Sequence, residues 1–303
     1  MGAITVSHLA KRFGDTQAVA DVTFEVEWGE VFGLLGPNGA GKTTTIRLIL
    51  DIFKPDHGTV SILEGPMTEA KKDRIGYMPE ERGLYQEARL EQCLLYLATL
   101  KGMSKPAARE RLAGYLERFD LAQHKHKKVK ELSRGMQQKA QIVSMVLHGP
   151  ELLIVDEPFS GLDPVNTQLV KDLMIELRAE GKTIIMSTHM MHQVEELCDR
   201  IALIDDGYNV LYGNLDEIRR AHSGHEVVVQ VAGELPPLVG VERVSRRNGA
   251  IQLTLQLDTQ PQAILQQLLD QVTVERFEVA VPTLDEIFIR TVRSGSQASG
   301  GGS

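Results

Sequence analysis

Residues 36–43 read Gly36-Pro-Asn-Gly-Ala-Gly-Lys-Thr43 and fit the phosphate-binding pattern G-x-x-x-x-G-K-[ST]. The apolar run 31–35 before them predicts a strand, and apolar residues at helical spacing after Thr43 predict a helix. Between two such elements, glycines let the backbone wrap closely around phosphates, and the helix N-terminus favours the anion. The alternative is a chance glycine turn, but the flanking strand and helix favour a nucleotide site.

This loop supplies most of the predicted nucleotide contacts. We expect Lys42 to reach the β- and γ-phosphates and Thr43 to ligate Mg²⁺. The expected contacts in the loop are Gly36, Asn38, Gly39, Ala40, Gly41, Lys42, Thr43 and Thr44.

Two acids follow a second buried strand. Residues 152–155 are a short apolar run, as expected of a strand covered on both faces, and Asp156 and Glu157 come directly after it. Asp156 fits the role of holding Mg²⁺ through water. Glu157, one residue further on, could polarise the attacking water. The alternative is a pair of helix-capping acids.

A histidine follows a third buried strand. His189 comes after the apolar strand Thr183–Ser187 and the adjoining Thr188. Ligands gather at the carboxyl ends of strands in a parallel sheet, so His189 could donate to the γ-phosphate or position water. A lone histidine is more often structural, and its place after a buried strand favours the functional interpretation.

The pattern of apolar residues predicts the fold class. Buried strands alternate with helices between residues 31 and 212, which indicates a parallel α/β sheet with right-handed crossovers. Alternating residues before position 27 predict an antiparallel sheet beside it, and residues 87–148 read as helical. Asp206-Gly207 predicts a hairpin turn.

Near residue 221 the pattern changes to that of a small α+β module. Strands are expected over 226–231, 251–257 and 272–279, with a turn at Asn248-Gly249. Helices are expected over 262–270 and 284–292. The predicted domains are therefore 1–220 and 221–293, and the Ser/Gly-rich residues 294–303 read as a flexible linker.

Composition excludes several classes. The formal net charge is −8, so the surface has no overall positive field, and we do not expect nucleic acid as a partner. Cys93 and Cys198 lie far apart, which argues against a disulfide framework or zinc site and for two small buried residues in a reducing compartment. No apolar run approaches the ~18 residues of a membrane helix, and no secretory signal is evident. We therefore expect a soluble, cytoplasmic protein whose work at a membrane is done through a partner.

Five motifs in order resemble the ATPase subunit of an ABC transporter. They are GPNGAGKT, LSRGMQQ (132–138), LLIVDEP (152–158), SGLDP (160–164) and STH (187–189), and the resemblance covers about residues 3–220. YMPEERGLY (77–85) and PTLDEIF (282–288) are similar to the type-2 exporter group, which includes sodium, drug and antibiotic efflux systems. The resemblance implies a P-loop NTPase with a RecA-like parallel sheet core, an N-terminal antiparallel β subdomain, a helical subdomain and a small C-terminal α+β domain.

The resemblance also implies contacts across a dimer. By themselves, Ser133 and Gly135 indicate only the start of a helix. In the family, residues at these positions would contact the γ-phosphate of ATP held by the opposite subunit. Gln137 belongs to the same motif. Asp163 would contact ATP across that head-to-tail interface. Phe13 would stack on adenine, where many relatives have tyrosine; the alternative is a core aromatic. The motif LSRGMQQ, called the signature motif below, departs from the family's common form at Arg134 and Met136. It retains Ser133 and Gly135.

Glu80 stands where relatives usually have a glutamine that touches Mg²⁺. A carboxylate is a good ligand for a hard cation, but it adds charge beside phosphates; at ~5 Å and an effective dielectric of ~20 the repulsion is of order 3 kcal/mol. Our hypothesis is that Glu80 senses the metal through water, and that Glu81 and Arg82 face the partner's coupling element. The alternative is a solvated loop acid.

The predicted function is that of an ATP-hydrolysing motor subunit. Two copies would close around two Mg-ATP and drive a separate integral-membrane permease from the cytoplasmic face of the cell membrane, where the chain is peripheral. The alternatives are a non-transport ABC ATPase acting on ribosomes or DNA, and a nucleotide-regulated binding module. A homodimer or a pairing with a similar ATPase both remain open, as do support and regulatory roles for the C-terminal module.

Overall fold

The chain divides into two compact units, residues 1–213 and 214–303. The division falls ahead of the boundary expected after residue 220, so the helix over Leu215–Ala221 belongs to the second unit. The computed structural model describes residues 2–81, 83–223, 226–247, 250–256, 258–289 and 291.

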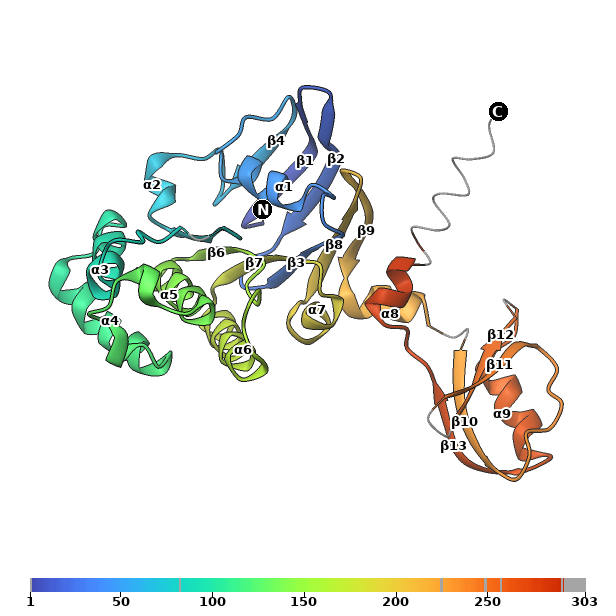
Figure 1. Ribbon diagram of the computed structural model, residues 1–303. Coiled ribbons are helices and arrows are strands. Elements are labelled where there is room, and N and C mark those ends of the chain that lie inside the picture. Colours follow the sequence, from blue (N-terminus) through green and yellow to red (C-terminus); the bar gives the residue numbers. More distant parts are fainter. Residues whose placement is uncertain are drawn as a thin grey trace. The chain divides into compact units, whose positions relative to one another are not determined.

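Within the described residues, the first unit holds one nine-stranded sheet in the order β4-β1-β2-β9-β8-β3-β7-β6-β5 (Figure 1). β3 is parallel to β7 and β8, and β6 is parallel to β5 and β7, while β1 is antiparallel to β2 and β4. Its strands are β1 (Ile4–Phe13), β2 (Thr16–Val26), β3 (Val31–Leu35), β4 (His57–Ile62), β5 (Ile75–Met78), β6 (Leu152–Asp156), β7 (Thr183–Thr188), β8 (Arg200–Asp205) and β9 (Tyr208–Asn214).

The parallel core and the N-terminal antiparallel strands are parts of this one sheet. They join where β2 runs beside β9, through the pair Asp21–Tyr208. Every residue of β3, β6 and β7 is buried, which is why the middle of each strand is apolar without alternation; the polar residues of β6 and β7 stand at the strand ends. The predicted α/β fold class is confirmed.

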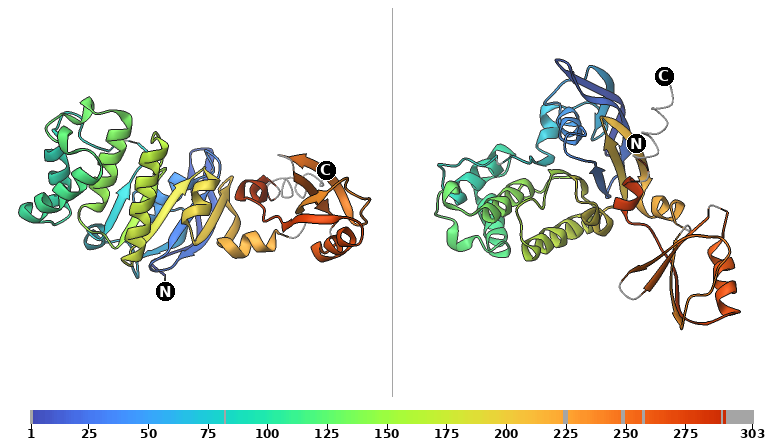
Figure 2. Two further views of the ribbon diagram at one scale, coloured as in Figure 1. Left: turned by 90° about the horizontal axis from the view of Figure 1, so that it is seen from below. Right: turned by 45° about the vertical axis from the view of Figure 1, so that its right-hand side comes forward.

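Helices cover both faces of the parallel strands (Figures 1 and 2). α1 packs through Ile46 and Ile49 into the core shared by the antiparallel and parallel strands. α6 and α7 lie against β7 and β3 on the other face. The helices of the first unit are α1 (Lys42–Ile49), α2 (Glu69–Lys72), α3 (Leu90–Leu100), α4 (Lys105–Arg118), α5 (Arg134–Val146), α6 (Pro164–Ala179) and α7 (Met191–Leu197), with short 3₁₀ turns at Ala122–His124 and Val129–Glu131.

The helical region predicted over 87–148 contains α3, α4 and α5, which pack against one another. Leu94, Leu112 and Leu116 are buried there. α4 begins two residues before the predicted position 107 because Ser104 caps it and Pro106 fits its first turn.

Among its described residues, the second unit contains a four-stranded antiparallel sheet in the order β11-β12-β10-β13. α9 packs one face of it through Ile264 and Leu268. Its elements are α8 (Leu215–Ala221), β10 (Glu226–Ala232), β11 (Val241–Arg247), β12 (Ala250–Leu255), α9 (Pro261–Leu269) and β13 (Thr273–Val279), and residues 284–289 are helical. The predicted Asn248-Gly249 turn lies outside the described residues, as do positions 257, 290 and 292 of the predicted strand and helix.

Three strands were not predicted from the sequence, namely β4, β5 and β11. Each lies at an edge of its sheet. Edge strands are short or carry polar residues on both faces, so they lack the clear apolar pattern of central strands. The predicted Asp206-Gly207 turn is confirmed, because both residues have the positive φ, 45° and 79°, of a tight hairpin.

Two expectations about the whole chain can be compared with the structure. Cys93 and Cys198 are both buried and free, as predicted. Among the described residues, no helix is both long enough and apolar enough to cross a membrane.

Candidate functional site

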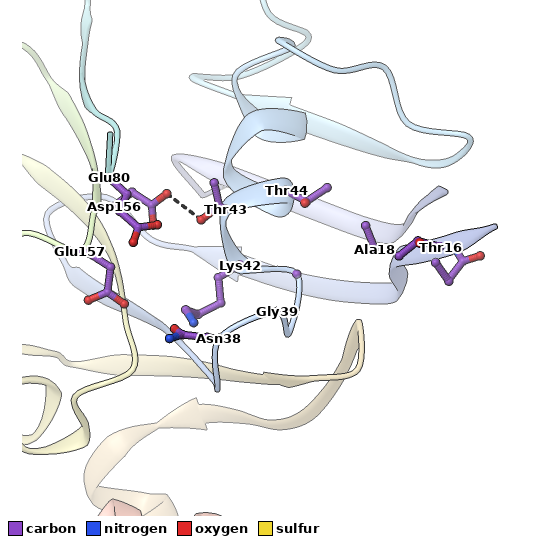
Figure 3. Close-up of a pocket in the computed structure, with 12 residues that line it drawn as sticks. Thr16, Ala18, Asn38, Gly39, Lys42, Thr43, Thr44, Glu80, Asp156 and Glu157 are labelled. Atoms are coloured by element: carbon purple, nitrogen blue, oxygen red, sulfur yellow. Dashed lines mark hydrogen bonds between the residues drawn. The ribbon is translucent and has the colours of Figure 1, made fainter. Parts of the chain in front are cut away.

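A cavity of about 390 Å³ lies at the carboxyl end of β6, beside the N-terminus of α1 (Figure 3). Four segments far apart in the sequence meet there. The lining residues are Thr16, Gln17, Ala18, Asn38, Gly39, Gly41, Lys42, Thr43, Thr44, Glu80, Asp156 and Glu157. The structure thus brings together most of the predicted nucleotide contacts and both acids; Gly36 and Ala40 belong to the same loop.

The loop before α1 requires glycine for steric reasons. Gly36 has φ 147°, and a Cβ there would lie 2.1 Å from the carbonyl oxygen of Ile204. Gly41 has φ 105°, and its Cβ would lie 2.4 Å from the carbonyl oxygen of Ala18. Such distances exclude any side chain, so these glycines let the loop pass close to β8 and β2.

Lys42 is buried and bends back onto its own loop. Its Nζ donates to the carbonyl oxygens of Gly36 at 2.8 Å and Pro37 at 2.9 Å. Burial lowers the pKa of Lys42, while the charge of Glu157, followed by those of Asp156 and Glu80, opposes that shift. Lys42 thus lines the cavity together with three carboxylates, those of Glu80, Asp156 and Glu157 (Figure 3).

Asp156 is held at both carboxylate oxygens. Thr43 Oγ1 donates to its Oδ2 at 2.8 Å (Figure 3), and Ser187 Oγ donates to its Oδ1. Asp156 is only 1% exposed. These bonds hold Asp156, at the end of β6, against the first turn of α1.

Glu157 has an unusual backbone conformation, and its carboxylate makes three hydrogen bonds. Its φ is 51°, in the left-handed region that few non-glycine residues adopt. Its Oε1 lies 2.8 Å from His189 Nδ1 and accepts the His189 backbone N–H at 3.1 Å, and its Oε2 accepts from Thr188 Oγ1 at 3.2 Å. The structure therefore joins Glu157 to His189, although His189 itself is not among the cavity's lining residues.

Glu80 lines the same cavity as Asp156 (Figure 3). Gln141 Nε2 donates to the carbonyl oxygens on either side of it, Pro79 at 2.8 Å and Glu81 at 3.3 Å. Glu80 also lines a neighbouring cavity of about 670 Å³ with Glu81, Arg134, Gln138, Ser160 and Gly161. Arg82, expected to face a partner, lies outside the described residues.

The remaining motif residues lie at helix N-termini away from the nucleotide cavity. Ser133 caps α5 by accepting from the N–H of Met136 at 3.3 Å, and a Cβ on Gly135 would lie 3.7 Å from the carbonyl oxygen of Gly161. Gln137 donates to the carbonyl oxygen of Leu132 at 2.9 Å. The signature motif and the SGLDP loop are therefore adjacent.

Asp163 caps α6. It accepts the backbone N–H of Asn166 at 2.9 Å, and this bond, together with one from the Asn166 side chain, lowers the pKa of the carboxyl. Asp163 does not line the cavity.

Phe13 ends β1 and is 42% exposed. Its ring meets Phe53 edge-on, with centroids 5.2 Å apart, and does not line the cavity; the stacking on adenine stays a prediction. Thr16, Gln17 and Ala18 line the cavity instead, and we had not predicted them. The available signal was their position directly after Phe13, across the β1–β2 turn.

Comparisons with known proteins decide the family. Residues 19–160 match the family described as ABC transporter, and residues 213–292 match "ATP-binding protein DrrA1-3-like, C-terminal domain". The ABC transporter ATP-binding protein YhaQ of Bacillus subtilis (strain 168) is 41% identical over 95% of this chain and 98% of its own length. The chain belongs to the ABC transporter ATP-binding proteins. It is an ABC-type ATPase that binds nucleotide.

Other ABC transporter ATP-binding proteins extend the comparison. Nod factor export ATP-binding protein I of Rhizobium sp. (strain N33) is 33% identical over 95% of this chain and 96% of its own length. A solved structure of an ATP binding subunit of an ABC transporter is 35% identical with a TM-score of 0.68, over 73% of this chain and 93% of that one. The cbiO1 structure from Clostridium perfringens, part of the transporter complex cbiONQ, is 28% identical with a TM-score of 0.61.

Proposed function

We propose that this ABC ATPase is the motor subunit of an exporter, in which two ATPase subunits close around two Mg-ATP and drive a separate permease. The observation that carries the proposal is the convergence of Lys42, Thr43, Asp156 and Glu157 on one cavity (Figure 3). These side chains combine a cation, a hydroxyl and two carboxylates, the groups that phosphoryl transfer to water requires.

ATP is the substrate, and the loop from Gly36 to Thr44 is proposed to hold its phosphates. The close approach of the glycines lets backbone N–H groups meet phosphate oxygens. Lys42 donates to two loop carbonyls, and phosphate oxygens would be stronger acceptors for the same charge. Phe13 is proposed to stack on adenine.

The residues beside the loop fit a magnesium ion. Thr43 and Asp156 place two oxygens 2.8 Å apart at the cavity, and the Glu80 carboxylate adds a third oxygen group. Mg²⁺ prefers oxygen and is usually held by one or two carboxylates together with substrate phosphates. When bound, Mg²⁺ supplies positive charge between the phosphates. Thr43 would hold it directly, and Asp156 and Glu80 would hold it through water.

Glu157 is proposed to be the general base. Its carboxylate lines the cavity and could accept a proton from water that attacks the γ-phosphate. His189 contacts Glu157 through both its ring and its backbone N–H, so it can orient the carboxylate as well as contact the γ-phosphate.

Ser133, Gly135, Gln137 and Asp163 support the dimer. In one protomer they stand at the N-termini of α5 and α6, outside the cavity that holds the loop. A head-to-tail partner would bring these termini to ATP from the other side, where a helix N-terminus stabilises the γ-phosphate. Because this chain carries both kinds of surface, we propose a homodimer.

The export step rests on the relatives. Nod factor export ATP-binding protein I resembles this chain over nearly its whole length. We therefore propose an integral-membrane permease as partner, with this chain peripheral at the cytoplasmic face of the membrane. The second unit is proposed to support packing or dimerisation.

Co-purification tests the export step. The protein is recovered from native membranes in mild detergent, and the proteins that accompany it are identified by mass spectrometry. We expect a polytopic membrane protein in stoichiometric amount. Recovery with ribosomes or nucleic acid alone would refute the exporter and leave the ATPase standing.

Glu80 has a separate test. We expect Glu80→Ala to weaken the Mg²⁺ dependence of ATP hydrolysis and its stimulation by the permease, with Glu80→Gln as the matched variant that keeps size and polarity. If Glu80→Ala changes neither, Glu80 is only a solvated loop acid.

A further inference from the structure

Two buried hydroxyls end the strand next to the acidic pair. β7 finishes with Ser187 and Thr188, whose exposed fractions are 0% and 1%. β6 and β7 are parallel, and their register places Asp156 directly beside Ser187. The hydroxyls therefore reach the site from within the sheet.

Ser187 holds the first acid. Its Oγ donates to Asp156 Oδ1, while Thr43 Oγ1 donates to Oδ2 from the other side at 2.8 Å. A bond to Oδ1 fixes the rotation of the carboxylate and keeps Oδ2 on the side of α1. Hydrogen-bond partners of this kind orient the side chains that hold a metal, and their removal typically lowers the metal affinity.

Thr188 holds the second acid. Its Oγ1 donates to Glu157 Oε2 at 3.2 Å and accepts the backbone N–H of Met190 at 3.1 Å. His189 occupies only the other oxygen, Oε1. Thr188 therefore sets the plane of the carboxylate, and its own oxygen is fixed by the turn into α7.

We propose that Ser187 and Thr188 are positioning residues with separate tasks: Ser187 orients Asp156 for magnesium, and Thr188 orients Glu157 for hydrolysis. The inference rests on the proposed roles of Asp156 and Glu157. It goes beyond them, because two hydroxyls on one strand then control metal binding and turnover independently.

The experiment compares two readouts in the full-length protein. The first is the ratio of the ADP Kd values measured by calorimetry in EDTA and in magnesium chloride. The second is kcat for ATP at saturating Mg-ATP. Thr183→Val is the matched control, because Thr183 is a buried hydroxyl at the opposite end of the same strand, where it accepts the N–H of Gly29 at 3.0 Å.

The two substitutions should have different effects. Ser187→Ala should reduce the magnesium-dependent gain in ADP affinity about tenfold and leave ADP affinity in EDTA unchanged. Thr188→Val should keep the magnesium-dependent gain and lower kcat about tenfold, because a misplaced base reacts slowly. Ser187→Thr and Thr188→Ser, which retain the hydroxyls, should restore most of each loss, and Thr183→Val should change neither readout.

The outcomes separate this inference from the proposed function. If the wild-type protein shows no magnesium-dependent gain, the metal site itself is wrong. If the wild type shows it and Ser187→Ala keeps it, or if both variants lose both readouts equally, the division of tasks is overturned. Should Ser187→Ala not fold, Ser187→Cys, with a weak thiol donor of similar size, should show the same selective loss of magnesium dependence.

Discussion

The substitution Glu157→Gln tests the proposed catalytic centre most directly. The amide keeps the size of the side chain and one acceptor oxygen, which can retain both contacts with His189. Its NH₂ then faces Thr188 Oγ1, which can turn to accept. At most one hydrogen bond is weakened, so the free energy of unfolding should change by about 1 kcal/mol or less.

The effect on hydrolysis should be far larger. An amide cannot take a proton from water, and loss of a general base costs about 10²- to 10⁴-fold in rate. At 1.36 kcal/mol per tenfold this is about 2.7 to 5.4 kcal/mol in the barrier. ATP should bind at least as tightly as before, because one of three carboxylates that line the proposed phosphate site has lost its charge.

Two assays check these expectations on the same preparation. Phosphate release gives the turnover number, and size-exclusion chromatography with light scattering, with and without Mg-ATP, shows whether the variant accumulates as a dimer. Slow hydrolysis with an ATP-stabilised dimer is the expected result. Turnover within about tenfold of wild type, with normal ATP binding, would refute the role of Glu157 as base.

The same variant should change the pH dependence of ATP binding. The charged form of Lys42 is the one expected to bind phosphate. Burial lowers the pKa of Lys42, and among the neighbouring charges Glu157 opposes this shift most strongly. Removing that charge lowers the pKa of Lys42 further. ATP binding by Glu157→Gln should therefore be lost at a lower alkaline pH than in the wild type, which a titration of Kd against pH measures.

Three further results are expected. Lys42→Ala should weaken ATP binding at least about 100-fold in a calorimetric titration, since a buried cation that meets phosphate is lost; an unchanged Kd would contradict this. Gly36→Ala should strongly lower the urea midpoint of unfolding, because its Cβ would lie 2.1 Å from a backbone oxygen. Gly39→Ala, where φ is 86° and the space is open, should cost only about 1–2 kcal/mol. Equal urea midpoints for the two variants would contradict this geometry. Cys93 and Cys198, whose pKa values burial raises, should resist a thiol reagent until the protein unfolds, and fast native labelling would contradict their burial.

Sequence and structure agree best where the pattern is local. The loop from Gly36 to Thr43, the buried strand before Asp156 and the Asp206-Gly207 turn were all predictable, because each depends on residues a few positions apart. Central strands were found for the same reason, since burial on both faces demands uninterrupted apolar residues. The edge strands β4, β5 and β11 were missed because their residues meet fewer neighbours and carry a weaker pattern.

By itself, the sequence determined the order of the motifs, and with it the family, the phosphate loop and the acidic pair. Only the tertiary structure decided which groups meet. Thr43 and Asp156, 113 positions apart, share a hydrogen bond, and Ser187 adjoins Asp156 because β6 and β7 are neighbours in the sheet. Strand order and register are set by packing of the whole core, which no local stretch of the chain encodes.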